Sequence, residues 1–298
     1  MQFGACVPHY GVAASKKAVA DFCKLAEELE FNSIWTTDHI AVNKQFANPY
    51  GSLLESLMTL GYAAAKTEHV TLGTSIIVLP MRNPILFAKE TATLDQLSDG
   101  RLILGLGAGW MEDEFATLGS NFRDRGRIMN EQIRLLRELW TSGEPKFDGR
   151  FFKLSDVAFL PKPAQANGPP IWIGGTSPAA LKRVAHLGDG WHPVGLSPNE
   201  LARGTAKLNS IMKEKRKIVM SVRVPVKISS SATTTYSLSS GEQAYMIGGT
   251  REAVVREIEA FQQVGLNHLI CYYGNESYDR VESQATLFAK EIMPSFNR

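Results

Sequence analysis

Cysteine is scarce in this sequence, and the three that occur, Cys6, Cys23 and Cys271, show no paired spacing. Neither a disulfide framework nor a cysteine-based zinc site is therefore predicted, and we expect three reduced, buried thiols, as in a cytosolic protein. A chain of 298 residues can bury roughly three quarters of the surface that its unfolded form exposes, so it needs no such cross-link for stability.

The sequence also lacks an excess of charge of one sign and any long apolar run. Lys and Arg total 32 against 30 Asp and Glu, a net charge of +2, whereas nucleic-acid-binding proteins carry a strongly basic face. No run approaches the ~18 apolar residues of a membrane span. The first residues show no basic segment followed by an apolar one, as a secretory signal would. We therefore expect a cytoplasmic protein with no nucleic-acid or membrane partner.

Several catalytic motifs are missing as well. The sequence contains no H-E-x-x-H zinc motif and no G-x-S-x-G nucleophile elbow. We predict no metal site. Four side chains, His9, Asp38, His39 and His192, could still converge on a metal, so a metal-dependent barrel hydrolase stays as an alternative.

Short apolar runs alternate with helical periodicity along the whole chain, which predicts eight strand–helix pairs. Apolar strands covered on both faces favour a parallel sheet, and a count of eight favours a closed (β/α)8 TIM barrel. The expected strands are 2–8, 32–37, 70–79, 101–107, 171–173, 190–192, 217–226 and 267–272, and the expected helices are 17–30, 52–66, 84–98, 124–141, 178–187, 196–215, 250–264 and 277–293.

The remaining residues are assigned to insertions in a single domain that spans 1–298. A typical barrel needs about 250 residues, and two stretches, about 143–168 and 229–245, carry the excess. We expect both at the carboxyl-terminal face of the barrel. The first contains a turn between short aromatic runs, which predicts a hairpin. The second begins with small polar residues and is typical of a mobile loop or lid.

Polar, aromatic and glycine residues follow six of the predicted strands at the end where the active site of this fold lies. Barrel loops are polar in any protein, and the fold alone implies no function. The strongest catalytic candidates are the adjacent residues Asp38 and His39. His39 can shuttle a proton near neutral pH, and Asp38 can accept a hydrogen bond from a ligand. The structural alternative is that Asp38 caps the next segment and His39 only packs.

A second candidate is the run Gly174-Gly175-Thr176-Ser177-Pro178. Its glycines allow close approach of a ligand to the backbone, Thr176 or Ser177 can cap the next helix, and Pro178 suits the first turn. The exposed N–H groups would then form an anion site. A plain capped turn is the alternative. The similar run at 247–250 is a rival phosphate site, although we favour simple capping there.

These motifs resemble the bacterial luciferase-like oxidoreductases, and most closely the branch that uses the deazaflavin coenzyme F420. The motifs are specific to the superfamily and less specific for which flavin is bound. The resemblance covers about residues 1–294, and its matching stretches are 30–39, 70–76, 94–101, 104–110, 171–177 and 187–193.

The resemblance implies an enzyme that transfers a hydride between F420 and a small organic substrate, acting as a homodimer. The alternative is an FMNH2-dependent monooxygenase fed by a separate reductase. His39 would be the acid/base beside the ring, and a non-proline cis peptide between Ser75 and Ile76 would back it. The implied cofactor-binding residues are Asp38, His39, Ser75, Ile76, Gly107, Ala108, Gly109, Trp110, Gly174, Gly175 and Thr176, and the expected substrate pocket contains His9, Tyr10, Trp191 and His192.

One departure from the family concerns the substrate. In the sugar-phosphate dehydrogenase that the chain resembles, a glutamate follows the turn after the fourth strand, and here that position is Trp110. With no clear basic pair for a substrate phosphate, a sugar phosphate is not expected. A non-catalytic cofactor-binding protein is the remaining alternative.

Overall fold

Eight parallel strands close into a barrel. The computed structural model describes residues 1–212, 216–231, 233–237 and 243–296. Each barrel strand pairs with the next, β9 pairs with β10, and β14 pairs back to β1, so the predicted (β/α)8 barrel is confirmed. Its strands are β1 (Gln2–Cys6), β2 (Ser33–Thr36), β3 (Thr71–Thr74), β5 (Leu102–Gly107), β8 (Ile171–Ile173), β9 (Gly190–Trp191), β10 (Val219–Ile228) and β14 (His268–Tyr272).

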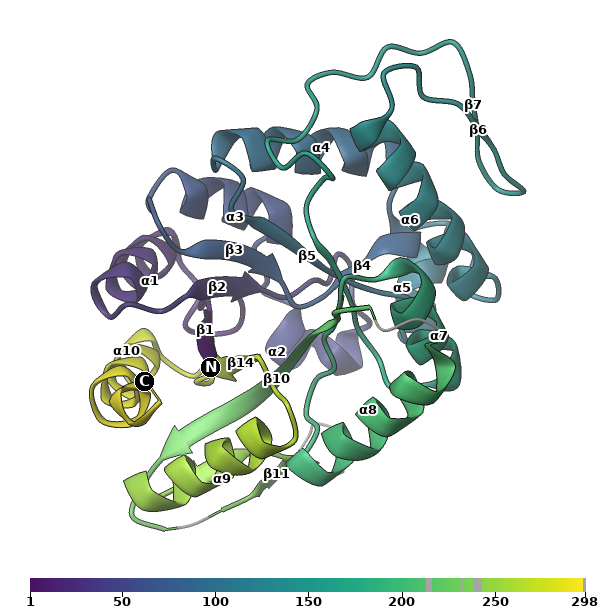
Figure 1. The fold of residues 1–298 in the computed structure, drawn as a ribbon. Helices are drawn as coiled ribbons and strands as arrows, with labels where there is room; N and C mark the ends of the chain where they lie inside the picture. Colours follow the sequence, from purple (N-terminus) through teal and green to yellow (C-terminus); the bar gives the residue numbers. More distant parts are fainter. Residues whose placement is uncertain (213–215, 232, 238–242, 297–298) are drawn as a thin grey trace.

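Helices surround the barrel and cover its outer face (Figure 1). Most begin at a Ser, Thr or Asn whose side chain accepts a backbone N–H of the first turn, as at Ser15, Asn83 and Thr250. The main helices are α1 (Lys16–Glu28), α3 (Ser56–Ala64), α4 (Pro84–Leu97), α6 (Arg125–Thr141), α7 (Pro178–Leu187), α8 (Pro198–Ile211), α9 (Arg251–Gln263) and α10 (Tyr278–Leu287).

The core lies between the strands and the helices and ties the two ends of the chain together. The ring of Phe3 in β1 packs edge-on against Phe288 and Phe296, at centroid distances of 5.4 and 5.7 Å. All three cysteines are buried and unpaired. Among the described residues, no helix is both long enough and apolar enough to cross a membrane.

The third predicted strand, 70–79, is interrupted. It forms β3, then a cis peptide between Ser75 and Ile76, and then the two-residue β4 (Ile77–Val78), which pairs with β5. The predicted non-proline cis peptide is thus present. A Cβ on Gly105 of β5 would collide with the carbonyl oxygen of Thr74, so glycine is needed there for the two strands to lie this close.

The two insertions lie at opposite ends of the barrel. The segment 143–168 contains the predicted hairpin, β6 (Phe147–Asp148) and β7 (Lys153–Leu154), which projects from the body of the protein (Figure 1). It connects a helix to a strand, so it lies at the amino-terminal end, where Gln165 Nε2 donates to the carbonyl of Leu102 at 2.9 Å. The prediction of the carboxyl-terminal face was wrong for this segment.

The second insertion follows the carboxyl end of β10. It contains the antiparallel strands β11 (Thr235–Ser237) and β12 (Gln243–Tyr245), and β13 (Ile247–Gly249) then pairs with β10. Residues 232 and 238–242, which belong to the predicted loop, lie outside the described residues. Short helices that were not predicted include the 3-10 turns Lys44–Phe46 and Leu79–Met81, α2 (Ala47–Tyr50) and α5 (Glu112–Thr117).

Candidate active site

A histidine and a glutamate form a hydrogen-bonded pair at the carboxyl ends of the strands. Nδ1 of His39, just after β2, lies 2.9 Å from Oε2 of Glu114 in α5. The other carboxylate oxygen accepts the backbone N–H groups of Ile40 and Ala41, at 2.5 and 3.1 Å. Because a carboxylate only accepts hydrogen bonds, Nδ1 carries the proton and Nε2 remains for a ligand.

Glu114 is held in its ionised form. The side chain is 2% exposed, and burial alone would raise its pKa. The hydrogen bonds from His39, Ile40 and Ala41 outweigh burial and leave the pKa of Glu114 below its ordinary value. The anion therefore fixes the orientation of the His39 ring.

Aromatic rings line the mouth beside His39. The ring centroid of Tyr50 lies 4.5 Å from that of His39, and Trp110 lies 6.2 Å from it, edge-on. Phe46 packs edge-on against Trp110 at 5.3 Å. Trp110 stays 58% exposed, which is unusual for so large an apolar ring next to a polar pair. This wall can cover one side of a flat ligand.

Asp38 is buried and fully engaged by the protein. One carboxylate oxygen accepts from Arg82 at 2.6 Å, and the other accepts the N–H of Val78 in β4 at 3.0 Å. Arg82 also pairs with Glu55 at 3.0 Å. Asp38 thus links the end of β2 to β4 next to His39, and its side chain is fully buried.

A buried network surrounds Ser75, the first residue of the cis peptide. The side-chain oxygen of Ser75 bonds to Nε2 of His192 at 2.8 Å, and Nδ1 of His192 bonds to Ser221 at 2.7 Å. Nη1 of Arg223 donates to the Ser75 carbonyl at 2.7 Å. Burial, with the nearby charge of Arg223, lowers the pKa of His192 to about 3. His192 is therefore neutral at pH 7 and positions Ser75 rather than supplying a proton.

The other predicted pocket residues fall into two groups. Tyr10 lies in the mouth, stacked between Tyr50 and Tyr272 with centroid distances of 5.9 Å on each side. His9 is fully buried and bonds to the backbone of Val7 and Thr37, and burial lowers its pKa. Trp191 faces the helix layer, where it fills the space above Gly204 of α8. Its position does not support a role in a substrate pocket.

Two of the predicted cofactor-binding glycines, Gly107 and Gly174, make room for Ile76. A Cβ on Gly107 or Gly174 would collide with Cδ1 of Ile76. Gly109 has a φ of +81° and would meet Phe115 and Val78. Because these glycines have no side chains, Ile76 and Ala108 can form the surface at the mouth.

The predicted anion turn is open to solvent. Gly175, with a φ of +91°, and Thr176 are both exposed. Ser177 caps α7 by accepting the N–H of Ala180 at 3.2 Å, and Trp191 Nε1 donates to the Gly175 carbonyl at 2.8 Å. The rival run at 247–250 caps α9 through Thr250, as favoured from the sequence. No group of three His, Cys, Asp or Glu residues that could hold a metal occurs in the part of the chain that the structure describes.

Several residues of this site were not predicted, among them Tyr50, Glu114, Arg82, Ser221 and Arg223. Glu114 lies in an acidic run, Glu112–Glu114, which resembles a solvated helix face in sequence. Only its burial distinguishes it. Arg223 lies within the mostly apolar strand β10, and a charge in the middle of such a strand was the available signal.

Comparisons with known proteins show the family and the fold of the chain. The model of the luciferase-like monooxygenase family matches residues 1–232. An F420-dependent glucose-6-phosphate dehydrogenase from Amycolatopsis mediterranei is 26% identical, over 93% of each chain. The monooxygenase RslO1 from Streptomyces bottropensis has a TM-score of 0.82 at 21% identity, covering 99% of this chain and 100% of its own. An F420-dependent secondary alcohol dehydrogenase, solved with an F420–acetone adduct, has a TM-score of 0.80 at 21% identity, covering 100% of this chain and 99% of its own.

Proposed function

The chain belongs to the luciferase-like monooxygenase family, and from that membership we propose that it is an oxidoreductase that moves a hydride between coenzyme F420 and a small organic substrate. The observation that carries the proposal is the His39–Glu114 pair, set at the barrel mouth beside the Ser75–Ile76 cis peptide. The relative from Amycolatopsis mediterranei, named for its use of F420, supports the choice of cofactor.

The residues present fit a deazaflavin with a phosphate-bearing side chain. The glycine-lined surface at Ile76 and Ala108, the exposed Trp110 and the polar edge of His39 suit a flat heterocycle. The exposed N–H groups at Gly175 and Thr176, before the N-terminus of α7, suit its phosphate. When bound, the deazaflavin supplies or accepts the hydride, as cofactors carry the hard chemistry in such enzymes.

The residues of this chain supply the rest. His39 holds or moves a proton at Nε2, because its Nδ1 proton is committed to Glu114. Tyr10, Tyr50 and Trp110 exclude water from one side of the reacting groups. Asp38, bound by Arg82 and Val78, keeps the end of β2 in place and acts on the cofactor only through His39.

A reduced-FMN monooxygenase is the second candidate, because the fold of the monooxygenase RslO1 matches this chain at a TM-score of 0.82. Such an enzyme would receive its cofactor from a separate reductase. Fluorescence titration of the purified protein with F420 and with FMN separates the two. We expect F420 to bind and to be oxidised or reduced in a substrate screen. Tight FMN binding with no F420 binding would instead favour the reduced-FMN monooxygenase over the F420-dependent oxidoreductase.

The proposal also includes assembly and location. We propose that 1–298 acts as one barrel domain, as a homodimer, in the cytoplasm. Light scattering of the purified protein at micromolar concentration tests this assembly. We expect the mass of a dimer, and the mass of a monomer would contradict the proposal.

A further inference from the structure

One arginine extends from a barrel strand into the mouth. Arg223 lies in the middle of β10, and its side chain is on the same face of that strand as Ser221, because side chains two residues apart point the same way. Ser221 bonds to His192 inside the barrel. Nη1 of Arg223 reaches the end of β3, where it donates to the carbonyl of Ser75 at 2.7 Å. The guanidinium therefore lies beside the cis peptide at the mouth.

The charge of Arg223 has no carboxylate partner among the described residues. Within that part of the chain, the Ser75 carbonyl is the one hydrogen-bond acceptor of its side chain, so Nε and Nη2 have none. Arg82, in contrast, pairs with both Asp38 and Glu55, at 2.6 and 3.0 Å. A cation that is partly removed from water without a counter-charge costs free energy. Arg223 is partly exposed, so a ligand can reach it.

The titratable groups near Arg223 do not supply the missing negative charge. They include the phenols of Tyr10, Tyr50 and Tyr272 and the thiol of Cys6. Burial raises the pKa of Tyr10 well above its ordinary value and that of Cys6 to about 11, although the charge of Arg223 opposes both shifts. Phenols and thiols are neutral near pH 7 unless their pKa values are strongly lowered. The cation is therefore surrounded by neutral side chains.

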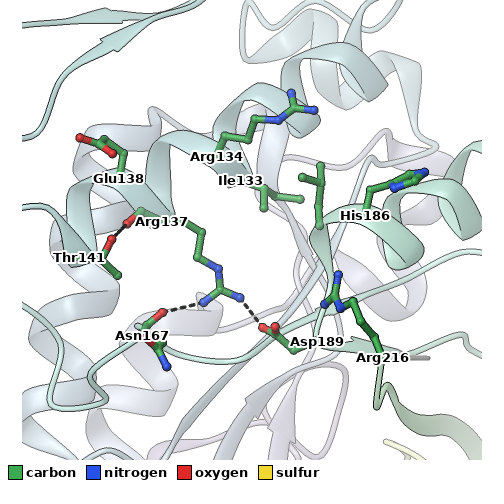
Figure 2. Close-up of a pocket in the computed structure, with 10 residues that line it drawn as sticks. Ile133, Arg134, Arg137, Glu138, Thr141, Asn167, His186, Asp189 and Arg216 are labelled. Atoms are coloured by element: carbon green, nitrogen blue, oxygen red, sulfur yellow. Dashed lines mark hydrogen bonds and ion pairs between the residues drawn. The ribbon is translucent and has the colours of Figure 1, made fainter. Parts of the chain in front are cut away.

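Two arginines in another part of the protein show the usual arrangement. In Figure 2, Arg137 reaches between Asn167 and the carboxylate of Asp189, to which it is ion-paired, in a cavity of about 600 Å3. Arg216, in the same cavity, donates to two carbonyls at the end of α7. Each of these guanidinium groups has two acceptors in the protein. Arg223 has one, although it lies at the mouth of the barrel where a substrate would bind.

A row of aromatic rings connects Arg223 with His39. The ring centroid of Tyr50 lies 4.5 Å from that of His39, and Tyr50 stacks on Tyr10 at 5.9 Å. Both tyrosines also lie near the charge of Arg223. A ligand that lies along these rings has one end at the guanidinium and the other at the imidazole. Aromatic faces suit a flat, unsaturated body.

Resting on the proposed function, we propose that Arg223 binds a carboxylate of the substrate, which is therefore a small planar organic acid. Nε and Nη2, the nitrogens that Ser75 leaves free, form the edge through which a guanidinium binds a carboxylate with two parallel hydrogen bonds. The single cation matches a single negative charge. The anchored acid directs the rest of its body along Tyr10 and Tyr50 toward His39, where the proton is transferred.

Binding of matched acids and amides tests this assignment. The F420-loaded protein is titrated with a panel of planar monocarboxylates, benzoate and cinnamate among them, and with the primary amide of each, and the cofactor fluorescence is followed. An amide keeps the shape of the acid and loses its charge. The best-binding acids should bind at least tenfold more tightly than their amides. A panel in which no acid binds more tightly than its amide would overturn the inference.

Variants of Arg223 then locate the preference. In Arg223→Gln the difference between acid and amide should fall to within about twofold, through weaker binding of the acids. Arg223→Lys keeps the charge without the two-nitrogen edge and should retain part of the difference. Arg256→Gln, at an exposed position on α9, is the matched control and should keep the wild-type preference. A merely structural role for Arg223 would weaken acids and amides equally, and that result would also contradict the inference.

The outcomes separate the inference from the proposed function. If F420 does not bind to the wild-type protein, the proposed function fails, and the same titrations followed by tryptophan fluorescence still test Arg223. If F420 binds and the acid preference is unchanged in Arg223→Gln, the inference fails while the function stands. A loss of F420 affinity of tenfold or more in Arg223→Gln would assign the cation to the cofactor and likewise overturn the inference.

Discussion

Glu114 in α5 accepts a hydrogen bond from His39 at the end of β2, with 2.9 Å between Oε2 and Nδ1, and so joins a loop helix to the barrel. We predict that Glu114→Gln lowers turnover by about 10- to 100-fold, because loss of the anion frees the ring and removes the partner for a charged imidazole. Stopped-flow assays should show this loss with F420 affinity nearly unchanged.

The pH profile distinguishes positioning from mere packing in this variant. The acid limb of kcat/KM should move in Glu114→Gln, since the charge next to the proton-transfer group has changed. Glu112→Gln, two residues away in the same helix and exposed, is the control. An unaltered limb with reduced turnover would assign Glu114 to folding alone.

Removal of the imidazole itself should be more damaging. We predict that His39→Ala keeps the fold and lowers turnover by about 100-fold or more, the usual contribution of a general acid or base. His69→Ala, at an exposed histidine, serves as the comparison. Steady-state kinetics with a matched thermal melt measure both. An unchanged rate would mean that another group transfers the proton.

The turn before α7 should be sensitive to any side chain at Gly175. With a φ of +91° and an added Cβ only 3.3 Å from that of Ala180, valine is strained there and covers the exposed backbone. Gly175→Val should therefore weaken cofactor binding at least tenfold by fluorescence titration. Gly143→Val, where a Cβ meets nothing within 4 Å, is the control. If Gly175→Val kept its affinity for the cofactor, the phosphate site would lie elsewhere, and Gly248-Gly249 would be the next candidate.

Two buried histidines should make stability depend on pH. Burial, first of all, lowers the pKa values of His192 and His268 to about 3 each. The unfolded chain then binds more protons below pH ~6.5 than the folded one, so stability falls as pH falls. We expect a loss of about 2 kcal/mol per histidine between pH 7.5 and 5, a window above the titration of Glu114.

Urea unfolding at several pH values measures this slope. The variant His268→Gln removes a ring that bonds to Ser33 at 2.8 Å. The stability lost between pH 7.5 and 5 should then be smaller by about 2 kcal/mol, whatever the change in absolute stability. A slope equal to that of the wild-type protein would show that His268 is not buried in its neutral form.

Strand and helix periodicity predicted the barrel because each βα unit buries a continuous apolar run. Most predicted boundaries lie within a few residues of those observed, for instance at α7, predicted and found at Pro178–Leu187. Periodicity could not predict the interruption at Ser75–Ile76, because the run 70–79 is apolar on both sides of it. That feature was expected only through the resemblance to the luciferase-like family.

Side-chain direction was harder to predict than position. Trp191 and His192 are adjacent, and successive strand residues point to opposite faces, so only one of them can face the barrel interior. The histidine does, through Ser75 and Ser221, while the tryptophan packs on α8. Glu114 shows a related difficulty, because an acidic helical turn resembles a solvated surface until the fold brings it against His39.

A crystal structure of the protein with F420 bound decides whether the barrel mouth is the redox site. We predict that the deazaflavin ring lies in contact with both His39 and Ile76, with its tail directed past Gly175 toward α7. A ring bound elsewhere on the protein, or density for FMN but never for F420 after soaking with each, would contradict the proposal.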